Sequence, residues 1–172
     1  MTCFEDLIWL FTSDKKSRGV VRFNIAEGAL LYKYSKIKCN GVLLEIGRKF
    51  GGSTSLIAAS LENGKLYSID ICYRPEVEEN IKPWKDKITL INKDSQKVKW
   101  KKALDLLFID GDHTLIGIKK DIKRYIPFVR RGGYVIFHDV GRLGIHKSIK
   151  DLLKNGWDKV SQVDSMAVLE RL

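Results

Sequence analysis

The sequence is poor in the residue types that mark several whole classes of protein. It has only three cysteines, Cys3, Cys39 and Cys72, which are widely spaced and form no CxxC pair. An odd, scattered set argues against a disulfide framework or a zinc knuckle and predicts a reducing compartment, which we take to be the cytoplasm. No run of 18 apolar residues occurs, so no transmembrane helix is expected. The N-terminal residues include acidic side chains and no basic leader, and we do not interpret them as a signal peptide.

Acidic residues are also scarce relative to basic ones, with 21 Asp and Glu against 31 Lys and Arg and a net charge of +10. Such an excess can reflect a nucleic-acid partner. The lysines, however, are spread along the whole chain among apolar residues, as on a solvated surface. Only residues 97–102, KVKWKK, combine basic and aromatic side chains as nucleic-acid contacts do, and Trp100 can equally be a core residue. We therefore expect a small-molecule partner, regard nucleic acid as unfavoured and a membrane as excluded, and leave a homo-oligomer open.

The apolar pattern alternates between two kinds of segment. Short continuous apolar runs are typical of buried parallel strands and occur at 41–47, 65–71, 88–92, 104–110 and 133–139. Segments with helical periodicity lie between them, at 53–62, 76–87, 115–129 and 144–156. This order predicts an α/β fold, a Rossmann-like parallel sheet with helices on both faces. The last residues predict a closing antiparallel hairpin that turns near Asp164 and Ser165.

The chain is long enough for one domain with a substantial core but too short for two comfortable ones. We expect a single domain over residues 1–172. Within it, residues 1–40 form an N-terminal helical cap, with helices around 4–11 and 26–36, and residues 41–172 form the α/β core. In open parallel sheets, ligands bind beyond the carboxyl ends of the strands.

A glycine-rich turn follows the first predicted strand, in LLEIGRKFGGSTS. Glu45, Gly47, Gly51 and Gly52 lie there, and Ser53 begins the next helix. Glycine allows a tight turn and a close approach of the backbone to a ligand. The N–H groups of the helix N-terminus are open to an anion. The spacing is neither GxGxxG nor a P-loop, so it favours a smaller anion such as a carboxylate over a dinucleotide pyrophosphate.

Polar residues also end the second and third predicted strands. Asp70 ends the second, and a carboxylate at that place can accept hydrogen bonds from both hydroxyls of a ribose. Asp94 and Ser95 follow the third, where they can contact an adenine amino group. Each alone can be a turn or cap residue, but their order and their places at strand ends together predict an adenosine ligand.

These motifs resemble the class I S-adenosylmethionine-dependent methyltransferases. Within that class the chain is similar to the small-molecule O-methyltransferases related to macrocin O-methyltransferase and to the cephalosporin hydroxylase-like group. The resemblance covers residues 25–172, and its most specific part runs from FIDGDH to GGYVIFHDV. It implies a seven-stranded sheet with an antiparallel last strand and S-adenosyl-L-methionine as cofactor. It also implies that Gly47 and the 51–53 turn contact the methionine moiety, Asp70 the ribose, and Asp94 and Ser95 the adenine.

The fourth and fifth predicted strands both end in a dense polar cluster, which consists of Asp110, Asp112, His113, His138 and Asp139. If the strands are neighbours, these side chains converge beside the transferred methyl group, and Asp110 also contacts the cofactor. Packed carboxylates repel one another unless a cation or a shared proton intervenes. We therefore predict a metal site of Asp110, His138 and Asp139, for Mg²⁺ or, with a histidine present, Mn²⁺ or Fe²⁺. The related sugar O-methyltransferases have carboxylates at all three matching positions, and this chain does not.

The predicted reaction is transfer of a methyl group to a small-molecule acceptor, at a hydroxyl oxygen. Asp110, Asp112 and His138 are the catalytic candidates, with or without a metal, and His113 is a further candidate base. The histidine and the carboxylates can also be mere caps and packing residues. Two other functions stay open at this point, a nucleic-acid or ribosome-associated methyltransferase and a non-catalytic nucleotide-binding scaffold.

Overall fold

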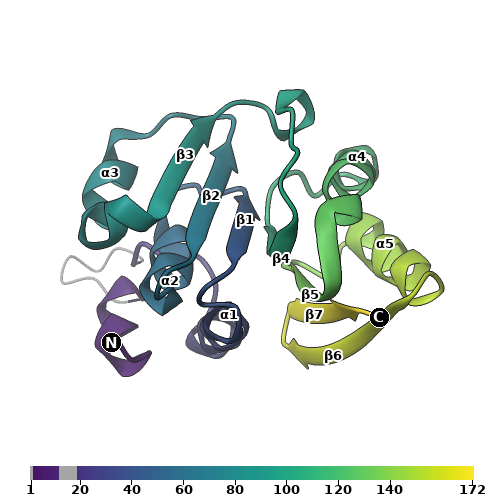
Figure 1. Ribbon diagram of the computed structural model, residues 1–172, viewed down its shortest axis with the longest axis horizontal. Helices are drawn as coiled ribbons and strands as arrows, with labels where there is room; N and C mark the ends of the chain where they lie inside the picture. The colour runs from purple at the N-terminus through teal and green to yellow at the C-terminus, as the bar shows by residue number, and fades with distance from the viewer. Residues whose placement is uncertain (1, 12–18) are drawn as a thin grey trace.

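The computed structural model describes residues 2–11 and 19–172, and the described chain forms one seven-stranded sheet with helices on both faces (Figure 1). The strand order is β3-β2-β1-β4-β5-β7-β6. Strand β7 runs antiparallel to both of its neighbours, and the pairs formed by β1 to β5 are parallel. The strands are β1 Val42–Ile46, β2 Lys65–Asp70, β3 Ile88–Asn92, β4 Leu104–Ile109, β5 Val129–Phe137, β6 Trp157–Val163 and β7 Met166–Arg171. The predicted fold, including the antiparallel last strand, is confirmed.

Helices fill the two outer layers. They are η1 Glu5–Leu10, α1 Ile25–Ile37, α2 Gly52–Ser60, α3 Pro75–Ile81, η2 Lys82–Lys87, η3 Ser95–Lys97, α4 Leu115–Tyr125, η4 Ile126–Phe128 and α5 Leu143–Leu153. Helices α1 and α2 pack on one face of the sheet, and α4 and α5 pack on the other. The N-terminal η1 packs beside α2 rather than on the sheet. Of the expected cap, residues 12–18 and Met1 lie outside the described residues.

The sheet is buried on both faces, and this explains why its strands appear in the sequence as continuous apolar runs. In β1, Leu43 belongs to the core beneath α1 and α2, whereas Leu44 and Ile46 belong to the core beneath α4 and α5. Successive side chains of a strand point to opposite faces, so a sheet covered on both sides needs apolar residues at every position.

Some element boundaries differ from the prediction because of local chemistry. The helix predicted over 115–129 ends at Tyr125, and a 3-10 turn containing Pro127 leads directly into β5 at Val129. Proline cannot donate the backbone hydrogen bond that would continue the helix. Strand β5 therefore begins four residues before the predicted Gly133, with an irregular pairing to β4 near Gly132, whose φ is +69°.

The sheet reverses its strand order between β1 and β4, and this point fixes where a ligand can bind. Strand β1 pairs with β2 on one side and with β4 on the other, and β4 pairs with β5. All four strands are parallel, so their carboxyl ends lie along one edge. The polar strand endings of the sequence are thus brought to the same rim.

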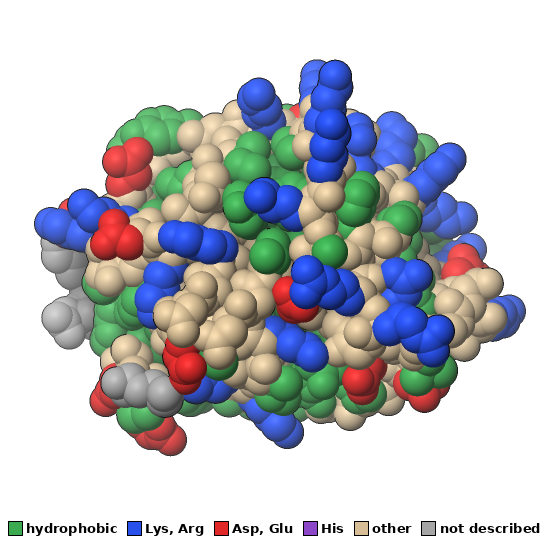
Figure 2. Space-filling view, viewed as in Figure 1, with side chains coloured by type: hydrophobic (Ala, Val, Ile, Leu, Met, Phe, Trp, Pro, Cys, Tyr) green, Lys and Arg blue, Asp and Glu red, His purple; other side chains and the backbone are tan. Residues whose placement is uncertain are grey.

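The surface agrees with the expectation of a solvated basic coat. Lysine and arginine side chains are scattered over most of the visible face rather than gathered into one stripe (Figure 2). Trp100 is 9% exposed and packs against Tyr67 and Tyr125, so it is a core residue and not a stacking platform. No helix among residues 2–11 and 19–172 is long and apolar enough to cross a membrane.

Candidate active site

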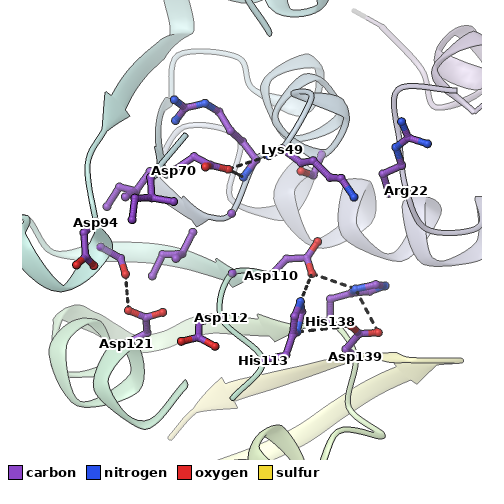
Figure 3. Close-up of a pocket in the computed structure, with 18 of the residues that line it drawn as sticks. Arg22, Lys49, Asp70, Asp94, Asp110, Asp112, His113, Asp121, His138 and Asp139 are labelled. Atoms are coloured by element: carbon purple, nitrogen blue, oxygen red, sulfur yellow. Dashed lines mark hydrogen bonds and ion pairs between the residues drawn. The ribbon is translucent and has the colours of Figure 1, made fainter. Parts of the chain in front are cut away.

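A cavity of about 950 Å³ opens at the carboxyl ends of β1, β2, β4 and β5. This is a size typical of small-molecule and cofactor sites. Seven of the residues predicted for the cofactor line it, namely Gly47, Gly52, Ser53, Asp70, Asp94, Ser95 and Asp110. The catalytic candidates Asp112, His113 and His138 line it as well, and so does Asp139, which was predicted as a metal ligand. Figure 3 shows how these side chains surround one space, with Asp70 and Asp94 on one side and the Asp110–His138 group on the other.

The turn after β1 can be made only with glycine at its first position. Gly47 has φ +89°, and a Cβ atom there would lie 2.2 Å from the carbonyl oxygen of Asp110. Gly51, with φ +84°, is the N-cap of α2 and gives no side-chain cap to the first turn of that helix. Gly51 faces Val77 and Ile81 and is not among the residues that line the cavity, so its contact with the cofactor stays a prediction.

Glu45 lies behind the cavity rather than on its wall, which corrects the prediction that it binds the cofactor. Its side chain is 0% exposed and accepts hydrogen bonds from the hydroxyls of Ser53, Thr54 and Ser68. Burial raises the pKa of Glu45, and the three hydroxyl donors oppose this rise. The residue joins the start of α2 to β1 and β2, and so it supports the turn that lines the cavity.

Asp70 ends β2 at the cavity wall, and backbone N–H groups already occupy most of the acceptor positions of its carboxylate. Its Oδ2 accepts hydrogen bonds from the backbone N–H groups of Arg48 and Lys49, at 3.0 and 2.9 Å, and its Oδ1 accepts one from Cys72 at 2.8 Å. An ionised carboxylate has about four acceptor positions, so one is left for a ligand. Asp70 is thus placed to shape the β1–α2 turn and to face a ribose at the same time.

The loop after β3 is held by a carboxylate that the sequence analysis did not single out. Ser95 donates its hydroxyl hydrogen bond to Asp121 of α4 at 2.6 Å, while Asp94 caps η3 through the backbone N–H of Gln96. Asp121 is 1% exposed and lines the cavity, and burial raises its pKa. Asp121 lies on the buried face of α4, at helical spacing from Ile118 and Tyr125. Only the folded loop shows that it faces the predicted adenine side.

The polar cluster of β4 and β5 is present, and histidines alternate with carboxylates in it. Oδ1 of Asp110 lies 3.1 Å from Nδ1 of His138 and 3.9 Å from Nε2 of His113. Asp139, which has φ +56°, places its carboxylate oxygens 3.5 Å from Nδ1 of His113 and 3.8 Å from Nδ1 of His138. The two imidazoles thus lie between the two carboxylates, as Figure 3 shows. His138, whose pKa is raised, can provide positive charge where a metal was predicted.

The second ring nitrogen of His138 also faces polar groups of the protein. Its Nε2 lies 3.3 Å from the hydroxyl of Ser165 and 3.7 Å from a carboxylate oxygen of Glu27, which is 3% exposed. Burial by itself lowers the pKa of His138, but the hydrogen bond with Asp110 and the charges of Asp110, Asp139 and Glu27 outweigh it, and the net effect raises the pKa. Glu27 and Ser165 lie far from the motifs in sequence.

The predicted metal site does not fit this geometry. Among the residues that the structure describes, no group of three or more His, Cys, Asp and Glu side chains is arranged to hold a metal ion. Nδ1 of His138, the nitrogen nearest the carboxylates, is taken up by Asp110.

Asp112 is placed differently from the other catalytic candidates. Its Oδ1 accepts a hydrogen bond from the backbone N–H of Thr114 at 2.8 Å, and its Oδ2 lies against Gly117 at the start of α4. In Figure 3 it lies between Asp121 and His113, apart from the Asp110–His138 pair. Asp112 therefore acts at the N-terminus of α4, and its position gives less support to the predicted role as a base.

Comparison with known proteins agrees with this site. The family described as "Methyltransferase domain" matches residues 44–140. An uncharacterized protein of Acanthamoeba polyphaga mimivirus is 31% identical over 110 residues, which are 56% of this chain and 50% of that protein. The chain thus spans about half the length of the curated relative that it matches.

Solved structures share the whole fold at low sequence identity. The O-methyltransferase TomG from Streptomyces achromogenes, solved in complex with SAM, has a TM-score of 0.72 at 14% identity over 87% of this chain and 81% of its own. The N-methyltransferase NodS from Bradyrhizobium japonicum, solved with S-adenosyl-L-homocysteine, has a TM-score of 0.70 at 17% identity over 98% of this chain and 97% of its own.

The strand order and the cavity at the switch point agree with the fold of these methyltransferases. The family match covers more than half of the residues and includes both polar strand endings. The chain belongs to the methyltransferase domain family.

Proposed function

We propose that this methyltransferase transfers the methyl group of S-adenosyl-L-methionine to a hydroxyl oxygen of a small molecule. The observation that carries the proposal is one cavity that joins the ribose-facing Asp70 to the Asp110–His138 pair. A cofactor and a proton acceptor can therefore share one enclosed space. TomG acts on oxygen and NodS on nitrogen, so the fold alone does not choose the acceptor atom. The acidic and imidazole cluster favours a hydroxyl, which must lose a proton.

The cofactor, when bound, supplies an electrophilic methyl group. The acceptor oxygen would take the methyl group from the sulfur of the cofactor, and its hydroxyl proton would go to the protein. We assign that proton to Asp110, with His138 as the partner that stabilises it. Both nitrogens of His138 face protein groups, so His138 itself is less accessible to an acceptor. His113 is 35% exposed at its side chain and is the second candidate.

Alignment of the acceptor is the larger part of the expected catalysis. Well-oriented reactants gain about 7–11 kcal/mol from alignment. Proton transfer to a positioned base contributes roughly 10²–10⁴-fold. The apolar residues Ile46, Ile69 and Ile71 line the cavity wall, and Ile46 and Ile69 are buried there.

The proposal is tested in two steps. Calorimetry with S-adenosyl-L-homocysteine first measures cofactor binding. The protein is then incubated with S-adenosyl-L-methionine and a panel of hydroxylated small molecules, and product S-adenosyl-L-homocysteine is measured. Asp110→Asn should lower turnover roughly 10²–10⁴-fold with cofactor affinity kept, whereas Asp158→Asn, an exposed control on β6, should change neither. Absence of cofactor binding would refute the proposal, and methylation of RNA or DNA alone would favour the nucleic-acid alternative.

A cytoplasmic location, a single domain and a homo-oligomer stay predictions. Free thiols support the first, because Cys3, Cys39 and Cys72 form no disulfide within the described chain.

A further inference from the structure

Three cationic side chains lie around the ring of Phe50, and two of them, Arg22 and Lys49, also line the cavity. The guanidinium carbons of Arg22 and Arg74 lie 4.8 and 5.0 Å from the centroid of the Phe50 ring, and the ammonium of Lys49 lies 6.0 Å from it. We call Arg22, Lys49 and Arg74 the cation cluster. Its members come from three separate segments, before α1, after β1 and before α3. Within residues 2–11 and 19–172, none of them forms a salt bridge.

The positive charges of the cation cluster have no carboxylate partner among the described residues. Like charges brought together raise one another's energy, and the face of an aromatic ring offsets only part of this. Nε of Arg74 is in addition buried, with no hydrogen-bond partner in the described chain. Buried polar groups are usually satisfied, so an unpartnered guanidinium nitrogen points to a missing acceptor. A bound anion would offset the positive charges and could also accept a hydrogen bond from Arg74.

The cation cluster adjoins the reaction space. Arg22 and Lys49 line the same cavity as Asp110. The chain at residues 20–21 crosses directly over Gly52, where an added Cβ would lie 2.6 Å from the backbone of Val21, and this holds Arg22 beside the β1–α2 turn. In Figure 3 the side chain of Lys49 extends toward the side of the cavity on which Arg22 and Asp110 lie, away from Asp94 and Asp121.

The carboxylate of the cofactor has a separate place to bind. The first-turn N–H groups of α2 have no side-chain cap, because Gly51 is the N-cap, and they are open to an anion. Gly52 and Ser53 of that turn line the cavity. The cation cluster, which lies outside this turn, is therefore left for another ligand.

We propose that the cation cluster binds an anionic group of the acceptor, a carboxylate, sulfate or phosphate, and so selects hydroxylated acids as substrates. This inference rests on the proposed function, because it assigns the second ligand of the same cavity. The anion holds one end of the acceptor while its hydroxyl reaches Asp110. Arginine suits this role because its planar fork binds carboxylate and phosphate oxygens in pairs.

The test uses inorganic phosphate as the probe. Phosphate is titrated into the full chain saturated with S-adenosyl-L-homocysteine, and binding is measured by calorimetry. We expect wild-type protein to bind phosphate, and Arg22→Gln and Arg74→Gln each to bind it about tenfold more weakly or worse, since hydrogen bonds to charged groups are among the strongest. Arg131→Gln removes an exposed arginine near the amino end of β5, away from the cavity, and should leave phosphate affinity unchanged.

Three outcomes would overturn the inference. Wild type and the Arg131→Gln control could fail to bind phosphate. All three variants could lose affinity equally, which would mean a general effect of charge. Phosphate could also compete with S-adenosyl-L-homocysteine, with Arg22→Gln weakening both ligands alike, in which case the cation cluster holds the cofactor's own carboxylate. A protein that binds phosphate through these arginines but never binds S-adenosyl-L-homocysteine would refute the proposed function and leave the anion site standing.

Discussion

Asp110 and His138 follow neighbouring strands, and their side chains meet with 3.1 Å between Oδ1 and Nδ1. The pairing is fixed by the sheet, since the backbone N–H of His138 also donates to the carbonyl of Ile109. On its other side His138 faces Ser165 and Glu27. The reaction site is thereby connected to the β6–β7 turn and to the start of α1, two regions outside the methyltransferase motifs.

The raised pKa of His138 predicts how stability depends on pH. The folded protein binds this proton more tightly than the unfolded chain does, so the stabilisation is fully present below pH about 6.5, the ordinary pKa of histidine. It is lost as the pH rises through the higher pKa of the folded state. Urea unfolding from about pH 5.5 to 8.5 should show His138→Gln most destabilised, relative to wild type, at the acidic end. The exposed control His146→Gln should run parallel to wild type, and a parallel curve for His138→Gln would contradict the assignment.

Asp70 is expected to serve both the turn and the cofactor. Asp70→Ala removes the acceptor of three backbone N–H groups and of the ligand, so S-adenosyl-L-homocysteine affinity should fall about 10- to 100-fold. Thermal unfolding should also occur at a lower temperature. Asp70→Asn keeps the shape and should lose less stability than affinity, which separates the two roles. Calorimetry that gives equal affinities for wild type and Asp70→Ala would remove the residue from the site.

The sequence was sufficient to predict the fold and most of the rim. Strands covered on both faces are continuous apolar runs, and each ends in polar or glycine residues, so both the elements and their functional ends were visible. The closing turn at Asp164 and Ser165 was also predicted correctly, between β6 and β7. In the cofactor half, Gly47, Asp70 and Ser95 all line the cavity as expected.

Two features of the site could not be predicted from the sequence: the direction in which single side chains point, and the contacts between segments that are distant in sequence. In a run that is apolar on both faces, no periodicity indicates which way Glu45 points, and it points into the core. The cation cluster and the Glu27–His138 contact join segments that are distant in sequence and carry no motif. Asp121 lies on the buried face of α4 together with Ile118 and Tyr125, and no motif marks it.

Divalent metal should have little effect on this protein. His138, whose pKa is raised, lies 3.1 Å from Asp110 and 3.8 Å from Asp139, where a cation was first expected, and in its protonated form it offsets the repulsion of the carboxylates. A ligand that binds the folded state raises the unfolding temperature. We therefore expect the same unfolding temperature in EDTA and in excess Mn²⁺. A rise with Mn²⁺ in wild type that disappears in both Asp110→Asn and Asp139→Asn would restore the metal hypothesis.

Glu45 should prove essential for folding rather than for catalysis. Glu45→Ala leaves three buried hydroxyls without their acceptor and should reduce the free energy of unfolding by about 2–4 kcal/mol, since each unsatisfied buried group costs about 1–3 kcal/mol before relaxation. Glu76→Ala, at an exposed position of α3, is the control.

The pH dependence of Glu45→Gln tests the same role more finely. Burial raises the pKa of Glu45, so the fold favours the neutral carboxyl, and the stability that this contributes is fully present below the unfolded pKa of about 4.3. That contribution is lost as the pH rises through the folded pKa. Glutamine resembles the neutral form and does not titrate. Urea unfolding should therefore show Glu45→Gln gaining stability relative to wild type as the pH rises from about 4.3, and a constant difference between the two proteins would show that Glu45 is charged without penalty in the fold.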